Sequence, residues 1–285
     1  VPSGEPLGTA AGLDPGVLLA PPPPPDRWVL SFTGFAELLA NPTEEAYLGL
    51  LLGGAAEADG RGERWSAHEE AWLAGPGEEP APPAEVIREA ARWVGETVHL
   101  LYELHGPGCG PEVLDAPGPF PAEEPPALHG VDPGKLRARV RELLRRGMAL
   151  GLAGLPPSAG RELPAILRLG GLTLRGRMDL AWREGEGAVV LDYKTNAAPP
   201  GGVQELVRQA GYDHQAKLYA LALKRGWGVQ RVEARLVFLA AGETWSVTWE
   251  PEWEEAYTAR ALETAARLRA LLAGAARTEE TAPAP

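Results

Sequence analysis

The sequence predicts an α/β fold, in which helices pack against a central sheet. Strand-like and helical patterns alternate between residues 162 and 273, in the order three strands, helix, two strands, helix. Val189 to Leu191 form a continuous apolar run, as expected for a strand that is covered on both faces. With 285 residues, 45% of them hydrophobic, the chain is long enough to bury a substantial core.

Two amphipathic helices are predicted before the strands. From Glu85 to His105, apolar residues recur at the three-and-four spacing that places them on one helical face. The segment from Leu136 to Leu152 has the same pattern.

The remaining elements follow from periodicity and from the positions of proline. Pro199-Pro200 ends the third strand segment, and Pro251 is well placed near the start of the last helix. The predicted strands are Glu162 to Leu169, Leu172 to Glu184, Ala188 to Thr195, Val232 to Ala240 and Thr244 to Trp249, and the predicted helices run from about Val203 to Arg225 and from Pro251 to about Ala273.

Composition suggests how the chain is divided. Residues 1–26 are predicted to be a proline-rich linker, because the run Pro21 to Pro25 cannot enter a helix or a central strand. Residues 27–160 are predicted to form a helical N-terminal part that carries His99, residues 161–275 the sheet-bearing core, and residues 276–285 a disordered tail. Val1 is not an initiator methionine, so we expect a processed chain or a fragment of a longer one.

Composition also excludes several classes of protein. No apolar run reaches the length of a membrane span and no signal peptide is evident, so we expect a cytoplasmic protein without a membrane partner. The single cysteine, Cys109, excludes a four-cysteine zinc or iron–sulphur site within this chain. The net charge of −12 argues against coating of nucleic acid by bulk electrostatics, unless bound divalent ions or a tethered partner supply positive charge.

Charged residues stand where two predicted strands should lie side by side. Strand geometry puts Asp192 and Lys194 on one face, and the Gly-bearing turn at residues 184–187 can fold Asp179 back beside them. A solvated surface ion pair is the simpler alternative. It is disfavoured because charges that end a buried strand carry a desolvation cost. The three residues therefore predict a metal site.

Residues on two helices have the right chemistry to complete such a site. His99 alone would be an ordinary half-buried histidine, but a neutral imidazole can join two aspartates around a metal ion. Gly95, one turn earlier, leaves space on the same side of the helix. Gln215 and Tyr219 are four residues apart and share a helical face.

Taken together, these motifs resemble the RecB-type nuclease domain of the PD-(D/E)XK superfamily, found at the C-terminal end of RecB and AddA helicase-nucleases. The similarity covers about residues 27 to 275. It includes the entry segment Trp28-Val29-Leu30-Ser31-Phe32-Thr33, Gly95 with His99, Glu162, Gly176-Arg177-Met178-Asp179, Asp192-Tyr193-Lys194-Thr195, and Gln215 with Tyr219. The resemblance implies a restriction-endonuclease-like core with a central mixed sheet flanked by helices, plus an N-terminal helical part.

The resemblance also implies an activity and roles for individual residues. It implies a Mg²⁺-dependent deoxyribonuclease, with Mn²⁺ as a possible substitute. The implied metal ligands are His99, Asp179, Asp192 and the backbone carbonyl of Tyr193. Lys194 would act at the attacking water, Gln215 and Tyr219 would support the site, and Glu162 would belong to the catalytic set.

The implied partners are those of helicase-nucleases that process double-strand breaks for recombinational repair. The domain would cut single DNA strands delivered by a helicase motor in the same polypeptide or complex, together with a second helicase-nuclease subunit. The short link from Thr195 to Gln215 is more similar to AddA than to RecB, and Cys109 alone cannot hold the iron–sulphur cluster of some relatives.

Two other functions stay open. One is a nuclease-like scaffold that binds DNA without cutting it, and the other is a freestanding RecB-like exonuclease or restriction-type endonuclease. The proline-rich opening favours a tethered domain. Two further motifs fail on their residues: His68-Glu69-Glu70-Ala71-Trp72 lacks the second histidine of a zinc protease, and Gly130 to Lys135 lacks the spacing of a phosphate loop.

Overall fold

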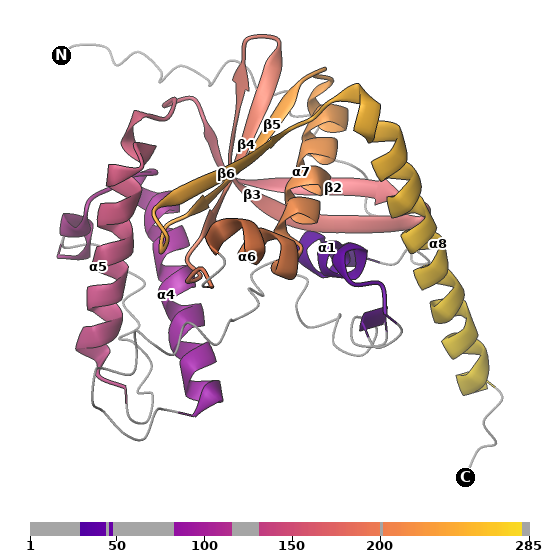
Figure 1. Cartoon of the computed structure of the whole chain (residues 1–285), viewed down its shortest axis with the longest axis horizontal. Coiled ribbons are helices and arrows are strands. Elements are labelled where there is room, and N and C mark those ends of the chain that lie inside the picture. The colour runs from indigo at the N-terminus through magenta and orange to yellow at the C-terminus, as the bar shows by residue number, and fades with distance from the viewer. Residues whose placement is uncertain (1–28, 44–45, 48–82, 116–130, 200–201, 281–285) are drawn as a thin grey trace, which may run out of the picture.

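The computed structural model describes residues 29–43, 46–47, 83–115, 131–199 and 202–280. It confirms the predicted α/β class: a mixed sheet is flanked by helices on both faces (Figure 1). The elements are β1 (Val29–Ser31), α1 (Phe32–Ala40), α4 (Ala84–His105), α5 (Pro133–Ala149), β2 (Gly160–Leu169), β3 (Leu172–Glu184), β4 (Gly187–Lys194), α6 (Gly202–Ala210), α7 (Tyr212–Trp227), β5 (Val232–Phe238), β6 (Glu243–Thr248) and α8 (Pro251–Glu280). Short 3₁₀ turns occupy Pro111–Leu114 and Leu152–Gly154.

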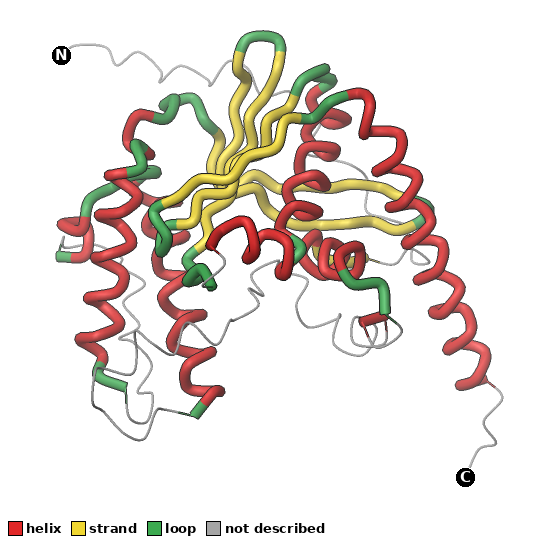
Figure 2. Tube along the Cα trace, in the orientation of Figure 1, coloured by secondary structure: helices red, strands yellow, loops and turns green. Residues whose placement is uncertain are grey.

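The sheet is built around the long strand β3. Its main order is β1-β3-β4-β5-β6, and β2 also pairs with β3. The β1–β3 and β4–β5 pairs are parallel, whereas β2–β3, β3–β4 and β5–β6 are antiparallel. Figure 2 shows the strands as one strongly twisted sheet, which matches the right-handed twist of most sheets.

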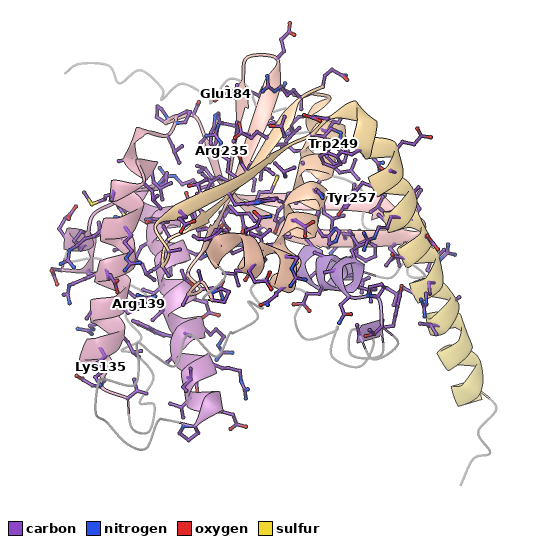
Figure 3. All side chains as sticks on the ribbon, viewed as in Figure 1. Lys135, Arg139, Glu184, Arg235, Trp249 and Tyr257 are labelled. Atoms are coloured by element: carbon purple, nitrogen blue, oxygen red, sulfur yellow. The ribbon has the colours of Figure 1, made fainter. Side chains whose placement is uncertain are left out.

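Two hydrophobic clusters lie on opposite faces of β4. Val190 belongs to the cluster formed with α1, α6, α7 and α8, whereas Val189 and Leu191 belong to the cluster formed with α4 and α5. β4 is buried along its whole length, as the apolar run predicted. Trp249 and Tyr257 anchor α8 to the first cluster, and Figure 3 shows both side chains beside this helix.

The structure differs from the sequence-based expectation at four places. The helix predicted from Val203 to Arg225 is two helices, because Gly211 adopts a left-handed φ of 69° and lies close to Ala36 and Ala40 of α1. Helix α5 begins and ends three residues earlier than predicted, since Asp132 caps its N-terminus through the Gly134 N–H.

The other two differences concern the N-terminal part and the tail. The N-terminal part is not wholly helical, because β1 joins the sheet as a parallel partner of β3. Helix α8 continues to Glu280, past the predicted start of the tail at residue 276. The predicted linker, residues 1–26, and the segment His68 to Trp72 lie outside the described residues. None of the described helices is long and apolar enough to cross a membrane.

Candidate active site

The site is centred on a gap between strands along one edge of β3. Strand β2 pairs along the other edge of β3. The first edge is shared by β1, opposite Thr173–Arg175, and by β4, opposite Leu180–Glu184. Residues 176–179 therefore have no partner on this edge among the described strands. Asp179 lies in the gap and bridges it, because its Oδ2 accepts a hydrogen bond of 2.6 Å from the Tyr193 N–H of β4.

Helix α4 brings His99 to the same gap. The His99 Nδ1 lies 3.3 Å from Asp179 Oδ1, and both side chains are largely buried. Gly95 makes this approach possible, since a Cβ at that position would lie only 3.2 Å from the Thr195 Oγ1. The Gly-x-x-x-His spacing thus sets the distance between α4 and the end of β4.

Glu162 enters the site from β2 with an unusual backbone. Its φ of 48° is left-handed, and it is the one described residue other than glycine with a positive φ. The β2–β3 register places Glu162 opposite Asp179, although no strand pair forms there. Apolar side chains also change face at this point: Met178 packs with the α1 and α7 side and Leu180 with the α4 and α5 side. The irregularity turns two carboxylates toward one place.

Three of these side chains could hold a metal ion. Ligand atoms of His99, Glu162 and Asp179 lie within 4.8 Å of one another. One imidazole nitrogen and two carboxylates suit a divalent ion such as Mg²⁺ or Mn²⁺, because hard cations prefer oxygen ligands. The residues present therefore fit the implied metal. The role of Glu162 as a ligand, and the roles implied for Asp192 and the Tyr193 carbonyl, stay predictions.

Asp192 and Lys194 form a buried ion pair at the end of β4. The Lys194 Nζ lies 2.7 Å from Asp192 Oδ2, and each side chain is less than a tenth exposed. The ammonium group also lies 4.5 Å from the centre of the Tyr212 ring, whose hydroxyl donates to Asn196 Oδ1 at 2.9 Å. Alternation along β4 placed this aspartate and lysine on one face, as the sequence indicated.

The two aspartates have opposite pKa shifts. Burial raises the pKa of Asp192 to about 6, since the attraction of Lys194 only partly offsets it and the negative charge of Asp179 adds to it. Burial would also raise the pKa of Asp179, but His99, the Tyr193 N–H and Lys194 together hold it below its usual value. Asp179 is therefore the carboxylate that stays ionised, and Asp192 the one that gains a proton first on acidification.

Helix α7 supplies the two residues predicted to support the site. The Gln215 Nε2 donates to the Thr33 Oγ1 of α1 at 2.9 Å, while the Tyr219 ring stacks on Phe32 with centroids 4.8 Å apart. Burial, and next the negative charge of Asp192, raise the pKa of Tyr219 well above its usual value. A Cβ on Gly176 would lie 3.0 Å from Phe32, which explains the glycine in the Gly-Arg-Met-Asp motif.

The structure adds residues to this set that the sequence did not single out. Tyr212 lies against Lys194, Thr33 bonds Gln215, and the Arg177 Nη1 lies 3.5 Å from Glu162 Oε2. Thr33 and Arg177 fall within the motifs that carried the resemblance, but nothing in the spacing assigned them a contact. Tyr212 follows a left-handed glycine that sequence periodicity did not reveal.

The fold and the site together define an α/β protein with a restriction-endonuclease-like core and a carboxylate, histidine and lysine centre. The chain belongs to the PD-(D/E)XK nuclease superfamily, whose family model matches residues 71–285. The predicted membership in this superfamily is thereby confirmed. The comparison with curated proteins found no match.

The comparison with solved structures found matches of low sequence identity. A crystal structure of a candidate exonuclease from Eubacterium rectale has a TM-score of 0.49 and 16% identity, with 86% of this chain and 82% of that chain covered. A crystal structure of SSO0001 has a TM-score of 0.29 and 14% identity, with 46% of this chain and 63% of that chain covered.

Proposed function

We propose that this chain is a Mg²⁺-dependent deoxyribonuclease that hydrolyses phosphodiester bonds in single DNA strands. The observation that carries the proposal is the convergence of His99, Glu162 and Asp179 in the β3 gap, next to the buried pair Asp192 and Lys194. Superfamily membership supports the reaction class. The proposed ligands are His99, Asp179, Asp192 and the carbonyl of Tyr193, with Glu162 at the same centre.

A divalent ion bound there would offset the negative charge of the phosphodiester and make a neighbouring water more acidic. The chain's own groups then have separate tasks. Asp179 is held in one orientation by the Tyr193 N–H and by His99, so its carboxylate is preorganised. The Lys194 ammonium is held by Asp192 and the Tyr212 ring, where it can orient the attacking water and stabilise negative charge as it develops.

Gln215 and Tyr219 support these groups from α7. The Gln215 amide is fixed by Thr33, and the Tyr219 hydroxyl keeps its proton because its pKa is raised. Tyr219 therefore serves as a neutral donor close to two carboxylates. We regard both as positioning residues.

We further propose that the domain works with a helicase motor of the RecB or AddA kind, more similar to AddA, in the processing of double-strand breaks in the cytoplasm. A motor in the same parent polypeptide or complex, with a second helicase-nuclease subunit, would supply the single strands. The acidic charge of the chain supports delivery by a partner over independent capture. Peptide mapping of the natural protein would test whether a motor lies in the same polypeptide, because it would detect peptides that continue upstream of Val1.

The nuclease proposal is tested by strand cleavage in a Mg²⁺ titration with an end-labelled oligonucleotide. Lys194→Met should lower the cleavage rate by about 10²-fold or more, the usual effect of removing a group that stabilises transition-state charge. Lys135→Met, which changes a lysine of α5, is the matched control and should cleave at the wild-type rate. Equal cleavage by Lys194→Met and wild type would refute the assigned role.

The same titration separates the two alternatives. A scaffold would bind the oligonucleotide in a metal-dependent manner and yield no product at any protein concentration. A freestanding exonuclease or endonuclease would degrade long single strands without any motor, and the product lengths would distinguish trimming from internal cuts.

A further inference from the structure

None of the described helices covers one side of the β2–β3 arm. Along this arm, odd-numbered residues of β2 and even-numbered residues of β3 pack into the cluster with α1, α7 and α8. Residues of the opposite parity form the other face, and from Pro164 to Arg168 and from Arg175 to Arg177 those residues are exposed. Figure 1 shows α4 and α5 at the far end of the sheet from the β2–β3 hairpin. Within the part of the chain that the structure describes, this face is therefore open at Pro164, Ile166, Arg168, Arg175 and Arg177, whereas Thr173 on the same face is buried.

This open face carries a row of arginines. Arg177 pairs with Pro164 across the strands, Arg175 with Ile166, and Arg168 with Thr173. Each of these three cross-strand pairs contributes one arginine, and neighbouring pairs are about 7 Å apart because each strand residue advances 3.3–3.4 Å. Neither Arg168 nor Arg175 is ion-paired to another described residue.

The row ends at the candidate active site. Arg177, about half exposed, lies 3.5 Å from Glu162, which belongs with Asp179 to the group of candidate metal ligands. Ile166, which is 42% exposed, provides apolar surface in the middle of the row. The positive charge stands out because the chain as a whole has a net charge of −12.

We infer that the open face of β2 and β3 is a track for the sugar–phosphate backbone of the substrate strand, with Arg168, Arg175 and Arg177 each holding one phosphate. Arginine suits this task because its planar fork of donors matches phosphate oxygens. An extended single strand can follow a straight row of positive charge on a sheet. Ile166 offers apolar contact to a base in the middle of this row. A duplex would present its second strand away from the row.

The inference rests on the proposed nuclease function and adds the route of the strand to it. It also explains how an acidic protein can hold a polyanion: the local charge of the track, not the net charge, meets the phosphates.

The test replaces the two arginines that do not contact the site. Arg168→Gln/Arg175→Gln should raise the KM for a labelled single strand by about tenfold and leave kcat within twofold. It should also make the slope of log affinity against log salt shallower by about 1.4, since each phosphate contact to a single strand contributes about 0.7. Cleavage of bis(p-nitrophenyl) phosphate, too small to reach the track, should be unchanged.

Two further variants serve as controls. Arg225→Gln/Arg231→Gln removes the same charge at the other end of β4 and should change the KM by less than twofold. Arg168→Lys/Arg175→Lys keeps the charge and should restore most of the salt slope.

The outcomes distinguish this inference from the proposed function. If wild type cleaves but the track variant behaves like the Arg225/Arg231 control, the track is wrong and the nuclease proposal stands. If wild type does not cleave, the nuclease proposal fails, and fluorescence anisotropy with the same oligonucleotide still decides whether the track binds. Equal competition by a duplex of the same length would overturn the assignment to single strands.

Discussion

Glu162 offers the sharpest test of how this site is built. It is a strand residue with a left-handed φ of 48°, a conformation that strains any residue with a Cβ. Two replacements separate the backbone from the carboxylate. Glu162→Ala removes the carboxylate and keeps the strain, whereas Glu162→Gly removes both.

The expected difference follows from two opposing terms. The left-handed conformation costs alanine about 1–2 kcal/mol that glycine does not lose. Glycine in a strand is about 0.5–1 kcal/mol less stable than alanine because its unfolded chain has more freedom. Glu162→Gly should therefore exceed Glu162→Ala in free energy of unfolding by about 0.5–1 kcal/mol.

Arg168 is the matched control, since it is an exposed residue of the same strand without a positive φ. There the order should reverse, with Arg168→Gly less stable than Arg168→Ala by about 0.5–1 kcal/mol. The difference between the two sites cancels the entropy of glycine and leaves the strain, about 1–2 kcal/mol. Urea denaturation of the four variants measures it. If glycine lowers stability equally at both sites, Glu162 is not strained and its backbone does not aim the carboxylate.

Three further predictions concern the site and its support. Gly95→Ala should increase helix stability by about 1 kcal/mol yet lower kcat. The reason is that the new Cβ presses on Thr195 and moves α4 by a few tenths of an ångström. An unchanged kcat would contradict the role of Gly95 in setting the position of α4. In the metal-free protein, protonation of Asp192 at its raised pKa contributes about 3 kcal/mol to the free energy of unfolding below about pH 4, and this contribution is lost as the pH rises to about 6. Asp192→Asn should remove this pH dependence. Denaturation of the variant and of wild type at several pH values measures it. Gly147→Ala should destabilise the protein by about 1–2 kcal/mol despite the higher helix propensity of alanine, since the new Cβ overlaps the Tyr102 hydroxyl. In a double-mutant cycle, the Tyr102→Phe background should recover part of this loss of stability.

Elements with strong periodicity were predictable. The apolar run before Asp192 identified β4, and the three-and-four spacing identified α4, because burial of one face determines both patterns. Strand β1 was not predicted, since three residues are too few to show a period and their pairing with β3 is long-range. The break at Gly211 was missed because apolar residues continue on both sides of it.

The site was predictable where sequence neighbours supply it. Alternation along β4 predicted that Asp192 and Lys194 would face one side, and the turn at residues 184–187 predicted that β3 would return beside β4. Alternation could not predict how Glu162 meets Asp179, because that contact depends on an irregular backbone. The contact between Arg177 and Glu162 could not be predicted for the same reason.

The gap in β3 links these observations to the proposed chemistry. A carboxylate within a continuous ladder would lie between neighbouring side chains, with its backbone fully paired. At residues 176–179 none of the described strands pairs with one edge of β3, so Asp179 can accept a hydrogen bond from the Tyr193 N–H and still meet His99 from α4. Phe32 and Tyr219 pack over the face of the sheet at Gly176, and β2, with Glu162 and Arg168, lies along the opposite edge of β3. Closing the gap with a continuous strand would remove the ligand cluster even if each charged residue were kept, which is why the charge pattern in the sequence is necessary for this site but not sufficient.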